Sequence, residues 1–157
     1  LDDVTYLRDQ VKPEQVVSVR FTIEPETARL AAIYGKKADH DLIEMCAERC
    51  RNAPDWRGYE AWDNKLHHAI ARATQNKLYL YYFETLNVVR RSVVWGQPRK
   101  SLRPVENYSS FLEHDIIVQA IRSHDGDLAA QAMLDHLQSV YGRILPSMDL
   151  AIPKEFA

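Results

Sequence analysis

Four side chains of this 157-residue chain have the types and spacing to hold one metal ion. Asp63 and His67 are four residues apart, so in a helix both side chains leave the same face and can bind one cation from neighbouring positions. An isolated Asp-x-x-x-His pair often arises by chance and is usually a surface hydrogen bond. Two more histidines, His114 and His136, can join this pair and make a metal site the favoured interpretation.

His114 and His136 both lie in apolar stripes at helical spacing, which places each near the inner face of its helix. A turn at residues 124–127 falls almost midway between them, so the two helices would run antiparallel and bring both imidazoles to about the same height. One carboxylate and three neutral imidazoles suit a borderline divalent metal and leave positions for water or an incoming carboxylate. We expect zinc first, with nickel, manganese or iron as alternatives. The competing interpretation is four independently satisfied polar groups.

The remaining histidines and one glutamate are not assigned to this site. His40 begins a helix, His68 points about 100° away from its neighbour on the helix, and His124 belongs to a turn, so we expect these three to be structural or solvated. Glu113 could orient a ligand or pair with a base on a neighbouring helix, but its position next to a histidine does not by itself assign that role.

The elements that position these residues are predicted to be helices. Only 5 glycines occur, and most of the 7 prolines fall where the apolar period breaks, which is typical of helices joined by short connections. We therefore predict an all-α fold, an antiparallel helical bundle of about six or seven helices. The expected helices cover about residues 2–11, 25–35, 39–51, 55–73, 76–96, 105–123 and 127–145.

One segment is ambiguous. Residues 16–23 are rich in β-branched side chains, which favours a strand locally, between a helical start at Pro13 and a new helix at Pro25. Residues 97–104 contain two prolines and three basic residues and are predicted to form an exposed connection. The tail beyond Ser147 is expected to be loose.

Composition narrows the class of protein. A hydrophobic fraction of 46% and a charged fraction of 27% are typical of one soluble globular domain. No apolar run is long enough to cross a bilayer and no basic leader precedes an apolar stretch, so we expect a cytoplasmic protein without a membrane segment.

Cys46 and Cys50 share one helix face, where a disulfide between them would be geometrically unfavourable. The net charge of −2, with Lys and Arg spread along the chain, does not favour DNA binding by this chain alone.

Several stretches resemble a known family. Residues 63–71 followed by Asn76 are similar to the core signature of the C-terminal effector (FCD) domain in the FadR subgroup of GntR-type transcription regulators. The second half of that pattern is matched by Glu113-His114, Ile117, Ala120-Ile121, Asp125, Ala129 or Ala130, Met133 and His136-Leu137. Upstream, Arg20, Glu24-Pro25 and Leu30-Ala31-Ala32 resemble its first conserved stretch, so the match spans about residues 20–140. Leu66 stands where an aromatic residue is common, which should alter packing but not ligation.

The resemblance implies a homodimer, a metal at the four residues named above, and a small organic acid bound beside it. It places Arg20 where a guanidinium could grip the acid's carboxylate, the alternative being a surface ion pair with a nearby glutamate. It also implies a winged helix-turn-helix, expected at the N-terminus of the full-length protein but absent from this chain, through which operator DNA would be bound. On this interpretation residues 1–146 form the effector-binding and dimerisation domain and residues 147–157 a tail. We expect four aromatic residues in the core or at an interface, namely Trp62, Tyr79, Tyr82 and Trp95. One or two of them could line a pocket.

We therefore expect a sensor and not an enzyme. A metal-dependent enzyme is an alternative, because three imidazoles and a carboxylate with an open position could activate water or dioxygen. A structural metal-bound dimerisation module is another. No dedicated general base stands out, and neither Glu-x-x-His nor His-Glu-x-x-His occurs in the sequence.

Overall fold

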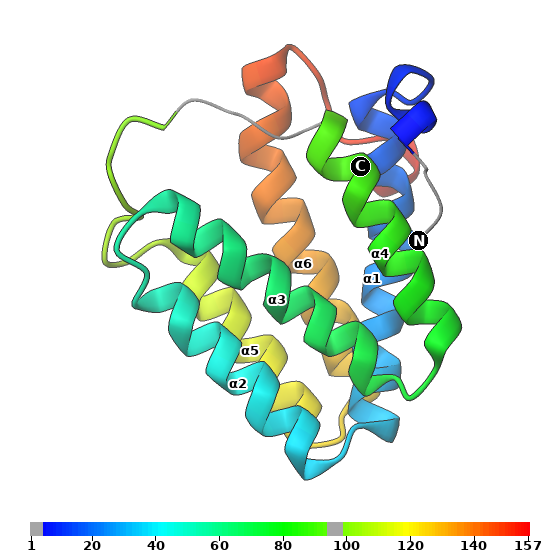
Figure 1. Cartoon of the computed structure of the whole chain (residues 1–157), viewed down its shortest axis with the longest axis vertical. Coiled ribbons are helices and arrows are strands. Elements are labelled where there is room, and N and C mark those ends of the chain that lie inside the picture. Colours follow the sequence, from blue (N-terminus) through cyan, green and yellow to red (C-terminus); the bar gives the residue numbers. More distant parts are fainter. Residues whose placement is uncertain (1–4, 94–98) are drawn as a thin grey trace.

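Six α-helices make up the bundle seen in the computed structural model, which describes residues 5–93 and 99–157 (Figure 1). They are α1 (Pro13–Tyr34), α2 (Lys37–Arg51), α3 (Trp56–Ala73), α4 (Lys77–Val93), α5 (Ser109–Arg122) and α6 (Gly126–Ile144). Short 3-10 helices occur at Thr5–Asp9, Leu145–Met148 and Lys154–Phe156. The described part of the chain contains no strand, which confirms the predicted all-α fold.

The strand expected over residues 16–23 is wrong. This segment is the first half of α1, which runs unbroken through Pro25. Buried positions recur along it at helical spacing: Val17, Phe21, Glu24, Ala28 and Ala31. Burying this face against the other helices therefore outweighs the local preference of β-branched residues for strands. Pro25 removes one backbone hydrogen bond, but the helix continues because α1 packs along α3, α4 and α6.

Side-chain caps set where three helices begin. Asp55 before α3, Asn76 before α4 and Asp125 before α6 each accept a hydrogen bond from a backbone amide two or three residues ahead, at 2.7, 3.0 and 3.0 Å. The caps at Asn76 and in the 124–127 turn agree with the sequence prediction. They fix the starting point, and hence the register, of the side chains on these helices.

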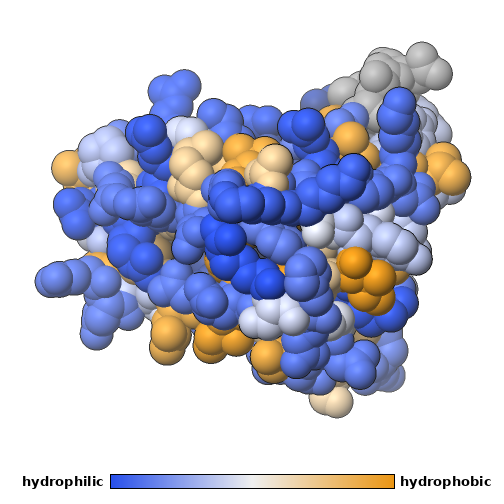
Figure 2. All heavy atoms as spheres, turned by 90° about the horizontal axis from the view of Figure 1, so that it is seen from below, coloured by the Kyte–Doolittle hydropathy of each residue, from blue (hydrophilic) through white to orange (hydrophobic). Residues whose placement is uncertain are grey.

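Helix α6 packs against both α1 and α5, α2 packs on α3 and α5, and α4 packs on α1 and α3 (Figure 1). Small residues such as Ala28, Ala32 and Ala129 are fully buried at these contacts and allow close approach of the helices. Cys46 and Cys50 are buried and form no disulfide in the described part of the chain. Figure 2 shows one end of the bundle covered mainly by hydrophilic side chains, with apolar ones in small separate groups. None of the described helices is long and apolar enough to span a membrane.

The C-terminal tail packs against the bundle and is not loose, contrary to the sequence prediction. The Phe156 ring meets the Phe21 ring edge to face, with centroids 5.0 Å apart. Ser18 Oγ on α1 donates a hydrogen bond to Glu155 Oε1 at 2.6 Å. Leu150 also packs against the core, so the apolar residues of the tail extend the same core as the helices.

The connection before α5 is exposed over residues 99–103, as predicted, whereas Pro104 is buried. Residues 97–98 of that prediction, and the predicted end of the preceding helix near Gly96, lie outside the described residues. Helix α5 begins at Ser109 and not near residue 105, because residues 106–107 form a turn.

Candidate functional site

Asp63, His67, His114 and His136, together called the four-residue cluster, meet inside the bundle. The first two lie one turn apart on α3, His114 comes from α5 and His136 from α6. One potential ligand atom from each lies within 4.8 Å of those from the others. The three histidines are 4%, 1% and 2% exposed in chain order. The structure thus brings together all four residues that the sequence singled out.

Two carboxylates lie behind the four-residue cluster and orient two of its imidazoles. His67 Nδ1 is 2.5 Å from Glu24 Oε1, and His136 Nδ1 is 2.6 Å from Glu113 Oε1. An ionised carboxylate only accepts hydrogen bonds, so Nδ1 carries the proton in each ring. In the neutral form of each ring, the Nε2 lone pair is then the atom available to a cation.

His114 has no carboxylate behind it. Its Nε2 lies 3.1 Å from Asp63 Oδ1, and its ring is nearly parallel to that of Tyr59, with centroids 6.4 Å apart. Neither nitrogen of His114, nor Asp63 Oδ1, makes a well-oriented hydrogen bond to any described residue, although all three atoms are buried. Buried polar atoms without partners are uncommon in folded proteins, and a cation between these side chains would satisfy two of them.

The charges around the four-residue cluster favour a bound cation. Burial acts to lower the pKa of His67, but Glu24 and Asp63 outweigh it and raise that pKa to about 9. Burial lowers the pKa of His136 to about 4, so this imidazole is neutral near neutral pH. Burial opposes the ionisation of Asp63, yet His67 and His114 hold its pKa well below the ordinary value. The interior therefore stabilises positive charge beside an ionised carboxylate and a neutral imidazole, as a metal ion requires.

A cavity of about 850 Å³ adjoins the four-residue cluster, and Asp63 and His136 form part of its lining. This volume lies within the range of small-molecule sites in proteins. Five cationic side chains line the cavity, against the two carboxylates of Glu60 and Asp63. The cationic residues are Arg20, Arg90, Arg99, Lys100 and Arg143. This excess of positive charge suits an anionic ligand.

Arg20 lies on α1 in the cavity wall and is only 8% exposed. Its Nε donates a hydrogen bond to Glu24 Oε2, and its Nη1 donates one to the Tyr141 hydroxyl at 2.5 Å. The ion pair with a glutamate therefore exists, but it is buried and not on the surface. Because Glu24 contacts both Arg20 and His67, it links the cavity wall to the four-residue cluster.

Sequence analysis did not identify Glu24 as the partner of His67, and it left Glu113 unassigned. Glu24 was noticed only as part of the first family-like stretch, because the segment before it was expected to be a strand. In one continuous helix, the four-residue spacing from Arg20 places both side chains on one face. The sequence therefore contains a signal for the Arg20–Glu24 pair, although β-branched residues favour a strand locally.

The aromatic lining also differs from expectation. The cavity is lined by Trp56, Tyr59, Tyr108 and Tyr141. Of the aromatics that the sequence suggested for a pocket, Trp62, Tyr79 and Tyr82 are not part of its described lining, and Trp95 lies outside the described side chains. Most of the lining aromatics lie near helix ends, where an apolar stripe does not indicate the direction of a side chain.

His40 and His124 contact each other away from the four-residue cluster, with ring centroids 5.2 Å apart. His124 Nδ1 lies 2.8 Å from the backbone oxygen of Ala32. The third remaining histidine, His68, faces Glu84 at 3.2 Å and is partly exposed. The structure thus places all three outside the site, as predicted.

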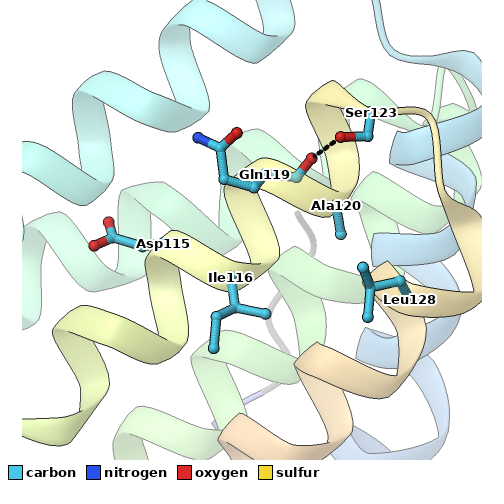
Figure 3. A pocket seen from close by; sticks show the side chains of 6 residues that line it. All are labelled: Asp115, Ile116, Gln119, Ala120, Ser123 and Leu128. Carbon is cyan, nitrogen blue, oxygen red and sulfur yellow. Dashed lines mark hydrogen bonds between the residues drawn. The ribbon is translucent and has the colours of Figure 1, made fainter.

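A second, shallow hollow lies on the outer side of α5 and α6 (Figure 3). Its apolar surface comes from Ile116, Ala120 and Leu128, and its volume is about 280 Å³. Among its lining residues only Asp115 is ionisable, and Arg51 pairs with that carboxylate at 2.6 Å. The only ionisable group of this hollow is already paired, so the hollow is a weaker candidate than the cavity beside the four-residue cluster.

Comparison with known proteins gives matches over most of the chain. Residues 15–139 match the family model described as the FCD domain. The chain is 29% identical over 127 residues to the "Putative L-lactate dehydrogenase operon regulatory protein" of Escherichia coli (strain K12), covering 80% of this chain and 49% of that protein. It is 26% identical over 132 residues to the "Glc operon transcriptional activator" of the same organism, covering 80% and 52%. It is 25% identical over 150 residues to the "Uxu operon regulator" of Haemophilus influenzae, covering 91% and 55%.

The chain spans about half the length of these curated relatives. A solved structure, "Streptococcus agalactiae GntR", matches with a TM-score of 0.68 and 20% identity, covering 91% of this chain and 62% of that one, which shows a shared fold. Arg20 and the four-residue cluster fall within the matched range, residues 15–139. The chain therefore belongs to the FCD domain family of GntR-type transcription regulators.

Proposed function

We propose that this chain is the ligand-sensing domain of a bacterial transcription regulator and that it binds one divalent metal ion together with a small organic acid. The four-residue cluster would hold the metal, zinc first, with nickel, manganese or iron as alternatives. The acid would lie beside it in the cavity, where Arg20 contacts its carboxylate. Binding of the acid controls a winged helix-turn-helix domain attached in the full-length protein.

The proposal depends most on the two carboxylates behind the four-residue cluster. Glu24 and Glu113 accept the Nδ1 protons of His67 and His136. Such carboxylates fix the orientation of metal-binding histidines and raise their basicity. A metal bound by three imidazoles and one carboxylate supplies positive charge and open coordination positions for an acid.

The cavity wall supports an acid as the effector. Glu24 and Tyr141 hold the Arg20 side chain in a fixed orientation, and a guanidinium is well suited to a carboxylate. Burial and the nearby charge of Arg20 lower the pKa of Arg90, so an anion close to both would relieve their repulsion. The name of one relative refers to an operon for L-lactate dehydrogenase, and lactate is a small hydroxy acid.

The site can regulate the attached DNA-binding domain because four helices contribute residues to it. The four-residue cluster draws on α3, α5 and α6, and Arg20 adds α1. An acid bound there changes the spacing of these helices and, in a homodimer, the separation of the attached DNA-binding domains. The effect on operator affinity depends on the difference in the acid's affinity for the two arrangements, with a coupling of about 1–3 kcal/mol. The regulator acts in the cytoplasm, and operator DNA is contacted only by the attached domain.

Thermal melting with and without metal tests this proposal. An organic acid at about 100 times its Kd should stabilise zinc-loaded protein by about 2.7 kcal/mol. For a domain of this size that corresponds to a rise in Tm of roughly 5–10 °C. Protein stripped with a chelator should show no such rise.

Each of the other outcomes favours a different function. Equal stabilisation of stripped and loaded protein would remove the metal from the sensing mechanism. Retention of zinc without stabilisation by any acid would favour a structural dimerisation module. Conversion of the acid during incubation would favour a metal-dependent enzyme.

A further inference from the structure

We infer that the acid sensed by this domain carries a second anionic group, which binds Lys100 and Arg143 at the outer end of the cavity. This inference rests on the proposed function, because the inner end of the cavity must first take the acid's other carboxylate. The outer group is a carboxylate or a phosphate, since the same cations suit both.

The two ends of the cavity are separated along two helices. Asp63 lies seven residues beyond Trp56 on α3, and Arg143 lies seven residues beyond His136 on α6. At 1.5 Å per residue each interval is roughly 10 Å along the helix axis. Asp63 and His136 therefore mark an inner end, and Trp56 and Arg143 an outer end, of one elongated space.

Some cations of the cavity form ion pairs with carboxylates, and others do not. Arg20 pairs with Glu24, and Arg99 pairs with Glu60 at 2.7 Å. Lys100 and Arg143 form no ion pair with any described residue. Among the described residues, the two cations at the outer end of the cavity thus have no carboxylate within ion-pair distance.

Neutral hydroxyl groups hold the Arg143 guanidinium in place. It donates to Ser109, Ser139, Tyr108 and Ser110 at 2.6, 3.1, 3.1 and 3.3 Å. The carboxylate of Glu113 is within its electrostatic influence, but the Glu113 oxygens already accept hydrogen bonds from His136 and Ser139. These neutral partners occupy the Nη hydrogens of Arg143 without compensating its charge, so the exposed guanidinium attracts an anion through that charge.

Trp56 holds the segment that carries Lys100 against the outer end. Its backbone amide donates to the Leu102 oxygen at 3.0 Å, and its indole Nε1 donates to Ser101 Oγ at 3.3 Å. Arg99 stacks on the same indole, 3.9 Å from the ring centroid. Lys100 is thereby kept in the cavity lining although it belongs to an exposed connection.

The volume of the cavity also favours a ligand with two ends. The volume of about 850 Å³ lies towards the upper end of the range of small-molecule sites in proteins. A three-carbon acid fills only part of such a space, so it would leave the outer cations in water. An acid that reaches Lys100 and Arg143 uses the whole length of the space.

Calorimetric titration of the zinc-loaded chain with matched pairs of acids tests the inference. The pairs are succinate against butyrate, adipate against hexanoate, and phosphoglycolate against glycolate. At least one acid with two anionic groups should bind about tenfold or more tightly than its partner with one. A preference for phosphoglycolate alone would identify the outer group as a phosphate, and a preference for succinate or adipate would identify it as a carboxylate.

Variants locate the source of that preference. In a double variant, Lys100→Gln with Arg143→Gln, the preference should fall to within about twofold, because the acid with two anionic groups loses more affinity than its partner with one. The matched control, Lys77→Gln with Arg72→Gln, changes exposed cations outside the cavity lining and should keep the preference. Lys100→Gln alone leaves the Arg143 contacts to α5 intact and should still lose part of the preference. This single variant therefore tests the inference even if the double variant does not fold.

Equal binding of both members of every pair, or equal weakening of both by the double variant, would overturn the inference and leave the proposed function in place. Failure of all acids to bind the zinc-loaded wild-type chain would overturn the proposed function, and the inference with it.

Discussion

Two groups of histidines lie where helices of this bundle meet, and only one of them has the surroundings of a metal site. In the four-residue cluster, Glu24 and Glu113 orient two imidazoles from behind, and Asp63 stands in front. In the pair of His40 and His124, the polar contact is a backbone oxygen, and burial followed by the charge of His124 lowers the pKa of His40. Carboxylates on both sides of the rings, and not the number of histidines, distinguish the proposed metal site from the pair of His40 and His124.

The largest expected effect comes from removing one histidine of each group. His114→Gln should reduce bound zinc from about one per chain to nearly none, because the site loses one of its four ligands. His124→Gln should keep its zinc. Metal analysis after dialysis checks both variants, and loss of zinc from His124→Gln alone would reverse the roles of the two groups.

The carboxylates behind the rings can be tested separately from the ligands. Glu113→Gln should weaken zinc binding about 10–100-fold, because an amide holds the His136 ring less firmly and makes it less basic. Glu113 is preferred to Glu24 for this test because the latter also pairs with buried Arg20. Competition with a chelator measures the affinity, and Glu44→Gln, an exposed carboxylate paired with Arg122, is the control. Affinity equal to that of the control would show that Glu113 does not support the site.

Arg20 allows acid binding to be separated from metal binding. Arg20→Lys should keep zinc but weaken the acid about 10–100-fold, because an ammonium group keeps the charge and loses the planar pair of donors. Calorimetry of the zinc-loaded variant measures this loss. Arg29→Lys on the same helix, where the arginine pairs with Glu26 near the surface, is the matched control. If both variants bound the acid equally well, Arg20 would not contact it.

The smallest expected effect is the contribution of His40 to the pH dependence of stability. Its pKa is lowered in the folded state, so the unfolded chain, with an ordinary value near 6.5, binds the proton more readily. The stability linked to His40 is therefore present above about pH 6.5 and lost as pH falls through its lower folded pKa. In metal-free protein, His40→Gln should reduce the acid-induced fall in Tm by roughly 1–3 °C. An identical fall in variant and wild type would show that His40 does not titrate differently on folding.

The sequence was most informative where one helix, or one turn between two helices, determines the geometry. The pairing of Asp63 with His67 follows from one helical turn, and the approach of His114 to His136 follows from a turn almost midway between them. The pairing of Glu24 with His67 could not be predicted, since 43 residues separate the two and they meet only through the packing of α1. The strand expected over residues 16–23 failed for the same reason, because tertiary burial overruled local propensity.

Zinc uptake by the chelator-stripped wild-type chain tests the proposed site most directly. Titration should show about one tight site per chain, formed by the four-residue cluster, with similar uptake of at least one of nickel, manganese or iron. If the folded chain bound none of these metals even when they were supplied in excess, the proposed metal site would be wrong. The acid-sensing proposal, which depends on that metal, would fall with it.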